Sequence, residues 1–181
     1  MNSHQDSMPD SELRRIRWLV AFFIVGLVLS GATAIPLETE INWLVEMTGA
    51  RPLVEAPASK SAPVWAEWLC RVQTGLHETN AKYPFISYGG DWLAFGHFVI
   101  AIAFIGAWRD PVRNIWLFEF GLIACALVIP YAFICGAVRG IPIGWRLIDC
   151  SFGVFGAVPL WICRRDAQRL ARLAPLADRN R

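Results

Sequence analysis

Charged side chains are scarce in this chain of 181 residues, making up 18% of it, where soluble domains carry roughly one quarter. Hydrophobic residues reach 55%, with nine tryptophans and eleven phenylalanines. The net charge is only +2 at pH 7, which gives no electrostatic basis for nucleic acid as a partner. This composition excludes an ordinary soluble domain and indicates an integral membrane protein whose main partner is the lipid bilayer.

Motifs for metals and redox cofactors are also lacking. The five cysteines form no Cys-x-x-Cys pair and the three histidines have no metal spacing, so we expect no metal and no cofactor. A haem between His77 and His97 is disfavoured, because the two should lie at different depths. Cys135 and Cys150 fall near the ends of neighbouring predicted helices. They could form a disulfide or stay free, because the sequence does not fix their distance.

Long apolar runs, in contrast, are abundant. Four of them approach the roughly 20 residues that a helix needs to cross a bilayer. They run from Trp18 to Ile35, from Trp92 to Trp108, from Ile115 to Cys135 and from Leu147 to Ile162. We read the first as a retained anchor rather than a cleaved signal peptide. The pattern predicts an all-α, polytopic membrane protein built on a bundle of four transmembrane helices.

Lysine and arginine are distributed unevenly about these runs. Eleven of the seventeen lie before the first run, between the second and third, or after the fourth: Arg14, Arg15, Arg17, Arg109, Arg113, Arg164, Arg165, Arg169, Arg172, Arg179 and Arg181. Because cytoplasmic segments carry the excess of basic residues, both termini should face the cytoplasm of a bacterial inner membrane.

This orientation divides the chain into three predicted parts. A cytoplasmic N-terminal tail covers residues 1–17, and the transmembrane domain covers 18–163 with an outer loop over 36–91. A basic cytoplasmic tail covers 164–181, and we expect its helical stretch to lie on the surface with no specific role.

The outer loop has its own pattern. Residues 38–47 and 64–77 place apolar side chains at helical spacing, which predicts two short amphipathic helices. The stretch 50–63, rich in Pro, Ala and Ser, predicts a flexible link between them. The second helix, with Trp65 and Trp68 on one face, could lie in the membrane interface or pack over the mouth of the bundle.

Polar residues near the outer ends of the predicted helices form the candidate site. His97, six residues inside the second run, is the natural proton-transfer group. Asp91 at the start of that run and Asp149 in the fourth are its candidate carboxylate partners. We therefore take His97, Asp91 and Asp149 as candidate catalytic residues. The alternative is that the same groups only stabilise the structure.

The candidate ligand-binding residues are Arg139, Arg146, Glu38 and Glu40. Two arginines suit a phosphate or a carboxylate. The structural alternative is that Arg146 pairs with Asp149, or with Glu38 or Asp91, and only fixes the register of the helices. Glu119 lies apart from this set, and we expect it to pair with the arginines of the loop before it.

Small residues recur at a spacing of four: Gly26, Ser30 and Ala34, then Gly153 and Ala157. This spacing permits close helix contact. The contact could lie within one chain, in a homo-oligomer or in a larger membrane complex.

Two strings support a family resemblance: Gly90-Asp-Trp-Leu-Ala-Phe-Gly-His97, and Arg139-Gly-Ile-Pro-Ile-Gly-Trp-Arg-Leu-Ile-Asp-Cys-Ser-Phe-Gly153. Together with Arg-Asp-Pro-Val-Arg-Asn after the second run, they resemble an uncharacterised bacterial family of four-helix integral membrane proteins. The resemblance covers residues 30–163 and implies no function.

The layout also resembles, more distantly, the VanZ-like family of small membrane proteins. His97 and the Arg139 to Asp149 stretch match that family's polar residues in kind and order. The chain departs from the pattern at Asp91, which precedes His97 by six residues rather than four, and at Gly153, which replaces an asparagine. The family's Glu-x-x-Gln pair before Arg139 is missing. This resemblance implies action at the cell envelope.

Two classes of function follow. The first is a non-enzymatic envelope protein that binds a lipid or small molecule, or serves as an accessory subunit of a membrane complex. The alternative is a membrane enzyme or transporter that acts on an anionic or lipid-linked substrate through the polar cluster.

Overall fold

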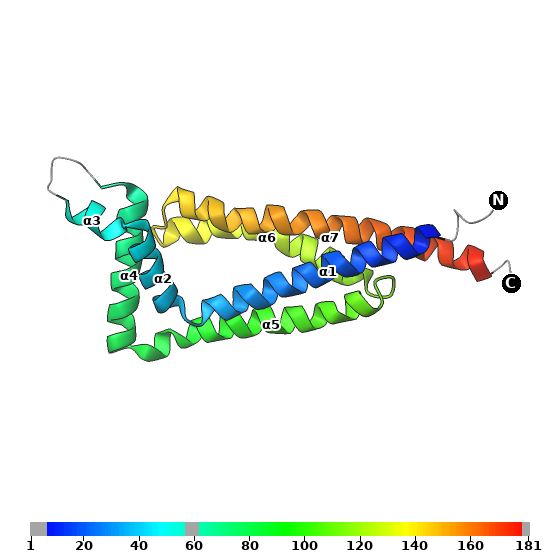
Figure 1. The fold of residues 1–181 in the computed structure, drawn as a ribbon, viewed down its shortest axis with the longest axis horizontal. Helices are drawn as coiled ribbons and strands as arrows, with labels where there is room; N and C mark the ends of the chain where they lie inside the picture. The colour runs from blue at the N-terminus through cyan, green and yellow to red at the C-terminus, as the bar shows by residue number, and fades with distance from the viewer. Residues whose placement is uncertain (1–6, 57–61, 179–181) are drawn as a thin grey trace. The chain divides into compact units, whose positions relative to one another are not determined.

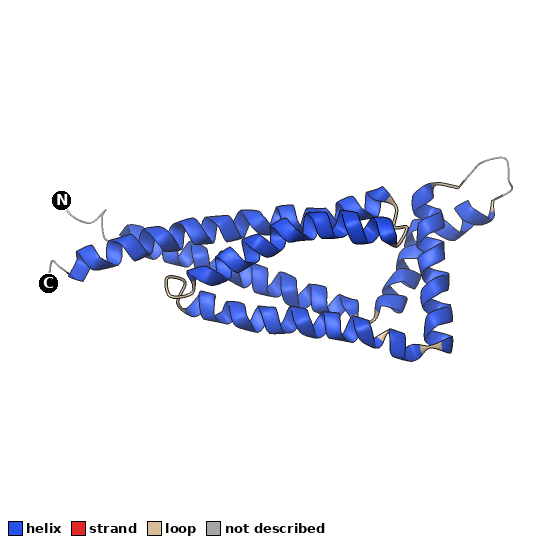
Figure 2. Cartoon of the chain, turned by 180° about the vertical axis from the view of Figure 1, so that it is seen from behind, coloured by secondary structure: helices blue, strands red, loops and turns tan. Residues whose placement is uncertain are grey.

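The computed structural model describes residues 7–56 and 62–178, and these form helices and no strands (Figure 2). In chain order the helices are α1 (Ser7–Ala34), α2 (Leu37–Thr48), α3 (Ala50–Glu55), α4 (Val64–Lys82), the 3-10 helix η1 (Pro84–Ile86), α5 (Tyr88–Arg109), α6 (Ile115–Val138) and α7 (Ile143–Asp178) (Figure 1). Within the described ranges, four helical stretches, in α1, in η1 with α5, in α6 and in α7, are long and apolar enough to cross a membrane. The predicted all-α, multi-pass fold is confirmed.

The helices extend further than the apolar runs that predicted them. α1 begins at Ser7 rather than near Trp18, and α7 continues without a break past Ile162. A basic sequence does not stop a helix, because Arg, Gln and Ala are all strong helix formers. The expectation of a surface-lying segment after Cys163 is wrong, since Asp166 and Ala167 in that segment are fully buried. Residues 1–6 and 179–181 of the two predicted tails lie outside the described residues.

The chain divides into two compact units. Unit 1 contains the chain up to Leu27 and from Val99 onward, and unit 2 contains Val28–Phe98. The boundaries fall inside α1 and α5, so each of these helices contributes one part to each unit.

The core of unit 1 is built by all four long helices. α1 contributes Ile16 and Val20, α5 contributes Phe104, and α6 contributes Phe118, all of them buried. α7 completes the core with Leu160, Cys163 and Ala167. These α7 residues recur every three or four positions, so one stripe of α7 faces the core along its length. The predicted four-helix packing is therefore present within this unit.

Glycines bring α6 and α7 into close contact, and the two helices run side by side in unit 1 (Figure 1). A Cβ added to Gly153 would lie 2.5 Å from the backbone oxygen of Cys125 and 2.5 Å from Cγ1 of Val128. Gly153 is thus one of the predicted small residues that sets a helix contact. Gly26 is not, because an added Cβ there would meet nothing within 4 Å.

Unit 2 is held together by a small apolar core and polar contacts between α2, α3 and α4. The buried core residues are Val45, Ala50, Ala66 and Leu69. Gln73 of α4 donates to Asn42 of α2 at 2.8 Å, and Arg51 of α3 donates to Gln73 at 2.8 Å. The two predicted amphipathic helices correspond to α2 and α4.

The predicted flexible link between these helices is only partly correct. Ala50–Glu55 forms helix α3, which begins directly after Gly49 ends α2 in the left-handed region at φ 64°. Glycine adopts this conformation without steric cost, so the chain can turn sharply there and start a new helix. Burial of Ala50 then fixes α3 against its neighbours. Residues 57–61 of the predicted link lie outside the described residues.

Candidate functional site

The predicted site residues divide between the two units. Asp91, His97, Glu38 and Glu40 belong to unit 2, whereas Arg139, Arg146 and Asp149 belong to unit 1. That the two sets form one polar cluster stays a prediction.

His97 lies in α5, where its ring is held by its own helix. Nδ1 donates a hydrogen bond to the backbone oxygen of Leu93 at 2.8 Å, because a carbonyl oxygen can only accept. Its Cβ belongs to a close contact between α1 and α5, since a Cβ added to Gly31 would lie 3.0 Å from it. His97 therefore has a structural role in unit 2, and Nε2 is the nitrogen left to accept a proton.

Asp91 does not share a face with His97. Six residues turn an α-helix by about 240°, so the two side chains point to different sides of α5. Asp91 lies in the first turn of the helix, where a negative charge is favourable. It is exposed beside a surface hollow of about 220 Å³ that it lines with Tyr88, Trp92 and Phe95. The structure thus gives no support to an Asp91–His97 pair.

Arg146 closes the turn between α6 and α7. Its Nε donates to the backbone oxygen of Ile141 at 2.7 Å. Its aliphatic stem lies over Gly136, where an added Cβ would meet Cγ of Arg146 at 2.8 Å. The connection needs Gly140 in the left-handed region at φ 68°. Arg146 thus holds together the turn that this glycine makes.

Asp149 and Arg139 are the exposed members of the unit 1 set. The suggested Arg146–Asp149 ion pair does not form: across residues 7–56 and 62–178, Asp149 has no hydrogen bond or ion pair through its side chain. The guanidinium of Arg139 is likewise uncommitted there. Arg139 follows the last residue of α6, Val138, whose side chain is 80% exposed.

Glu38 accepts hydrogen bonds in a polar network within unit 2. It accepts hydrogen bonds from Asn80 Nδ2 at 2.5 Å and from His77 Nδ1 at 3.0 Å. Ser87 in turn donates to the side-chain oxygen of Asn80. The bonds from Asn80, and next those from His77, hold the pKa of the Glu38 carboxyl below its ordinary value of 4.5. Glu38 therefore ties α2 to α4, while the half-buried Glu40 has no such partner among the described residues.

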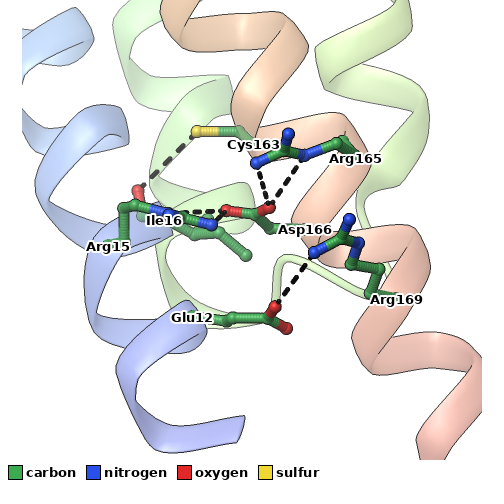
Figure 3. A network of polar contacts seen from close by, with 7 residues as sticks. All are labelled: Glu12, Arg15, Ile16, Cys163, Arg165, Asp166 and Arg169. Atoms are coloured by element: carbon green, nitrogen blue, oxygen red, sulfur yellow. Dashed lines mark hydrogen bonds and ion pairs between the residues drawn. The ribbon is translucent and has the colours of Figure 1, made fainter. Parts of the chain in front are cut away.

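A buried ion-pair network at the other end of unit 1 escaped the sequence prediction (Figure 3). Asp166 of α7 is 0% exposed. Arg15 of α1 donates to its Oδ2 from Nε at 2.8 Å and from Nη2 at 2.5 Å. Arg165 donates to its Oδ1 at 3.3 Å. Both carboxylate oxygens are thus occupied, and the group joins α1 to α7 rather than acting as a base.

Two further contacts extend this network. Arg169 lies 3.7 Å from Glu12, and the thiol of Cys163 lies 3.9 Å from the backbone oxygen of Ile16, again between α7 and α1 (Figure 3). One feature of the sequence does indicate that Asp166 has a partner in the core. Asp166 is the only acidic residue within 164–173, and it lies next to Ala167 on the apolar stripe of α7.

Glu119 has a different partner from the one predicted. Arg164 of α7 donates to it at 2.9 Å, whereas we expected the loop arginines Arg109 and Arg113. The loop has its own capping instead: Asp110 accepts a hydrogen bond from the backbone nitrogen of Arg113 at 3.0 Å. The basic segments of α1, of this loop and of α7 therefore gather at one end of unit 1, as Arg17 over the Trp108 ring also indicates.

No metal site is found among the described residues, where no group of three or more His, Cys, Asp or Glu side chains converges. The five cysteines are free thiols, so Cys135 and Cys150 are not bridged. Comparison with known proteins adds no relationship: no family model, no curated protein and no solved structure matches this chain.

Proposed function

We propose that this chain is a non-enzymatic, multi-pass protein of the bacterial cytoplasmic membrane that binds a lipid or another small amphiphile. Four helices long enough to cross a bilayer support the membrane assignment. Basic residues gathered at one end of unit 1 support an orientation with both termini in the cytoplasm. The resemblance to the VanZ-like family supports action at the cell envelope.

One observation carries the non-enzymatic part of the proposal: no two candidate catalytic groups are paired among the described residues, and three of the candidate residues already hold the fold. His97 donates to the backbone of its own helix, and Arg146 holds the α6–α7 turn. Glu38 is bound by two side chains of α4. Arg146 and Glu38 would have to give up these bonds to hold a substrate, which would weaken the fold.

Arg139 is the group that best suits an amphiphilic ligand. Its guanidinium is exposed and uncommitted within the described residues, and the apolar side chains of Val138 and Ile143 beside the turn are also exposed. A cation flanked by apolar surface matches a ligand with an anionic headgroup and a hydrocarbon tail. The two ends of the ligand would thus be recognised by neighbouring residues of one turn.

The test is to identify the amphiphile that copurifies with the full chain, by mass spectrometry of the protein in lipid nanodiscs. Arg139→Gln should reduce the bound anionic amphiphile several-fold. Arg172→Gln, a matched loss of one exposed arginine at the opposite end of α7, should leave it unchanged. Equal retention by all three proteins contradicts the proposal, and conversion of an added lipid-linked substrate by the wild type would favour the enzyme alternative.

A second candidate role, as a subunit of a homo-oligomer or larger membrane complex, has one observation in its favour. Gly26 lies on an exposed face of α1, one turn from the exposed apolar side chains of Phe22 and Leu29, and an added Cβ would meet nothing within 4 Å. Such a face permits close approach of another helix in the bilayer. Gly26→Ile should lower crosslinking between chains in membranes, and unchanged crosslinking would remove this candidate.

A further inference from the structure

The arginines at the basic end of unit 1 fall into two groups by their partners. Four are committed to carboxylates: Arg15 and Arg165 to Asp166, Arg164 to Glu119, and Arg169 to Glu12. The guanidinium groups of the others have no carboxylate partner in the part of the chain that the structure describes, and all are exposed: Arg14, Arg17, Arg109, Arg113 and Arg172. The second group therefore carries the unneutralised positive charge of this end.

One of these free arginines lies over the ring of a tryptophan. The guanidinium carbon of Arg17 lies 5.9 Å from the centroid of the Trp108 ring, and Arg109 follows Trp108 in the chain. Arg14 lies one turn before Arg17, so the two side chains share a face of α1. A ring beneath a guanidinium limits the directions it can adopt, which holds its outer N–H donors ready for an anion.

The surroundings indicate what kind of anion would reach this position. Trp18, next to Arg17, is 73% exposed, and Trp108 and Trp116 are exposed as well. Tryptophans at the ends of apolar helices lie at the level of lipid headgroups. Arg14 and Arg17 also line a surface hollow of about 480 Å³, together with Asp10, Ser11 and Leu13. With two arginines against one aspartate, the hollow has a net positive lining, which is complementary to a phosphodiester at headgroup level.

We infer that Arg14 and Arg17, which line one hollow and of which Arg17 lies over the Trp108 ring, form a binding site for the headgroup of an anionic phospholipid. The site lies at the opposite end of unit 1 from Arg139 and does not depend on the function proposed above. The phosphodiester receives the guanidinium donors, and the acyl chains lie along the exposed apolar surface of α1. Four neighbouring arginines are instead held by Asp166, Glu119 and Glu12.

The experiment uses the full chain in mild detergent, titrated with phosphatidylglycerol or phosphatidylcholine while native mass spectrometry counts bound lipids. The wild type should retain phosphatidylglycerol in preference. Arg14→Gln with Arg17→Gln should weaken that retention about tenfold or more, because each arginine near a membrane contributes roughly a fivefold factor. Arg71→Gln with Lys82→Gln, which removes the same charge from exposed positions of unit 2, should change it less than about twofold.

Two further measurements distinguish the effect of charge from that of the planar guanidinium, and a lipid from a free phosphate. Arg17→Lys keeps the charge but loses the planar group over Trp108, so it should cause a smaller loss than the double variant. Excess inorganic phosphate should not displace the lipid, because a free anion lacks the acyl chains. The inference is overturned if the wild type shows no lipid preference, if the control double variant loses as much, or if phosphate alone competes. Retention tied to Arg139 instead would support the proposed function and not this site.

Discussion

Asp166 shows how a single residue can join two helices that are far apart in the sequence. Its buried carboxylate is held mainly by Arg15, which approaches from α1. Arg15→Gln should lower the free energy of unfolding by about 2 kcal/mol, the typical contribution of a hydrogen bond to a charged group. Arg165→Gln should cost less, because its contacts are longer at 3.3 Å. Reversible thermal unfolding in nanodiscs would measure both.

Arg172→Gln is the matched control for these two variants. It removes an exposed arginine from the same helix, and surface changes of this kind alter stability by less than about 0.5 kcal/mol. If Arg15→Gln is no more destabilising than this control, the Asp166 network does not stabilise the fold.

For single residues, the sequence predicted which polar side chains lie in apolar surroundings but not which contacts they make. His97 and Arg146 were identified as polar groups in apolar surroundings, and both have structural contacts. Their acceptors are backbone oxygens, which no side-chain pattern reveals. Asp166 was missed, because a basic segment suggests a surface and burial depends on packing against α1.

The contact between α6 and α7 depends on Gly153 at the scale of elements. An alanine there would place its Cβ 2.5 Å from a backbone oxygen of α6, which a side-chain rotation cannot relieve. Gly153→Ala should therefore destabilise the fold by about 2 kcal/mol or more through overpacking. Gly26→Ala, in open space, should be neutral or stabilise by up to about 1 kcal/mol. Similar unfolding temperatures for the two variants would contradict the close contact.

The α2–α4 connection through Glu38 predicts a dependence on pH. Because the folded-state pKa of Glu38 lies below 4.5, its contribution is present above that pH and is lost as the pH falls through the lowered pKa. The protection of α2 amides against hydrogen exchange, corrected for the intrinsic rate at each pH, should therefore fall in acid. Glu38→Gln should reduce this acid response, whereas Glu46→Gln, an exposed change on the same helix, should preserve it. If Glu38→Gln leaves the acid response unchanged, the response arises from another titrating group.

Among the elements, the four long helices were predictable because long apolar runs need little tertiary information. Their ends were not, since α1 and α7 continue through basic residues that favour a helix as well as a surface. α3 was not predicted either. Its sequence Ala-Arg-Pro-Leu-Val-Glu is short and contains proline, and its place depends on Gly49 and on burial of Ala50.

For the whole molecule, the proposed orientation can be tested by insertion of a reporter. Alkaline phosphatase is active only outside the cytoplasm. Placed after Ala81, in the α4 segment, it should be active, whereas placed after Arg113 it should be inactive because that loop belongs to the basic, cytoplasmic end. Activity after Arg113 but not after Ala81 would indicate the inverted topology. Activity at both positions would contradict the membrane crossing by α5 between them.

Under the proposed function, polar residues of the helices hold the fold while the protein binds an amphiphile without transforming it. His97→Ala tests this most directly, measured as the unfolding temperature and the bound amphiphile in one nanodisc preparation. Loss of the bond to Leu93 should remove about 1 kcal/mol. The unfolding temperature should therefore fall by about 2–4 °C, with the amphiphile retained. An unchanged unfolding temperature, together with accumulation of an unconverted substrate that the wild type consumes, would contradict it.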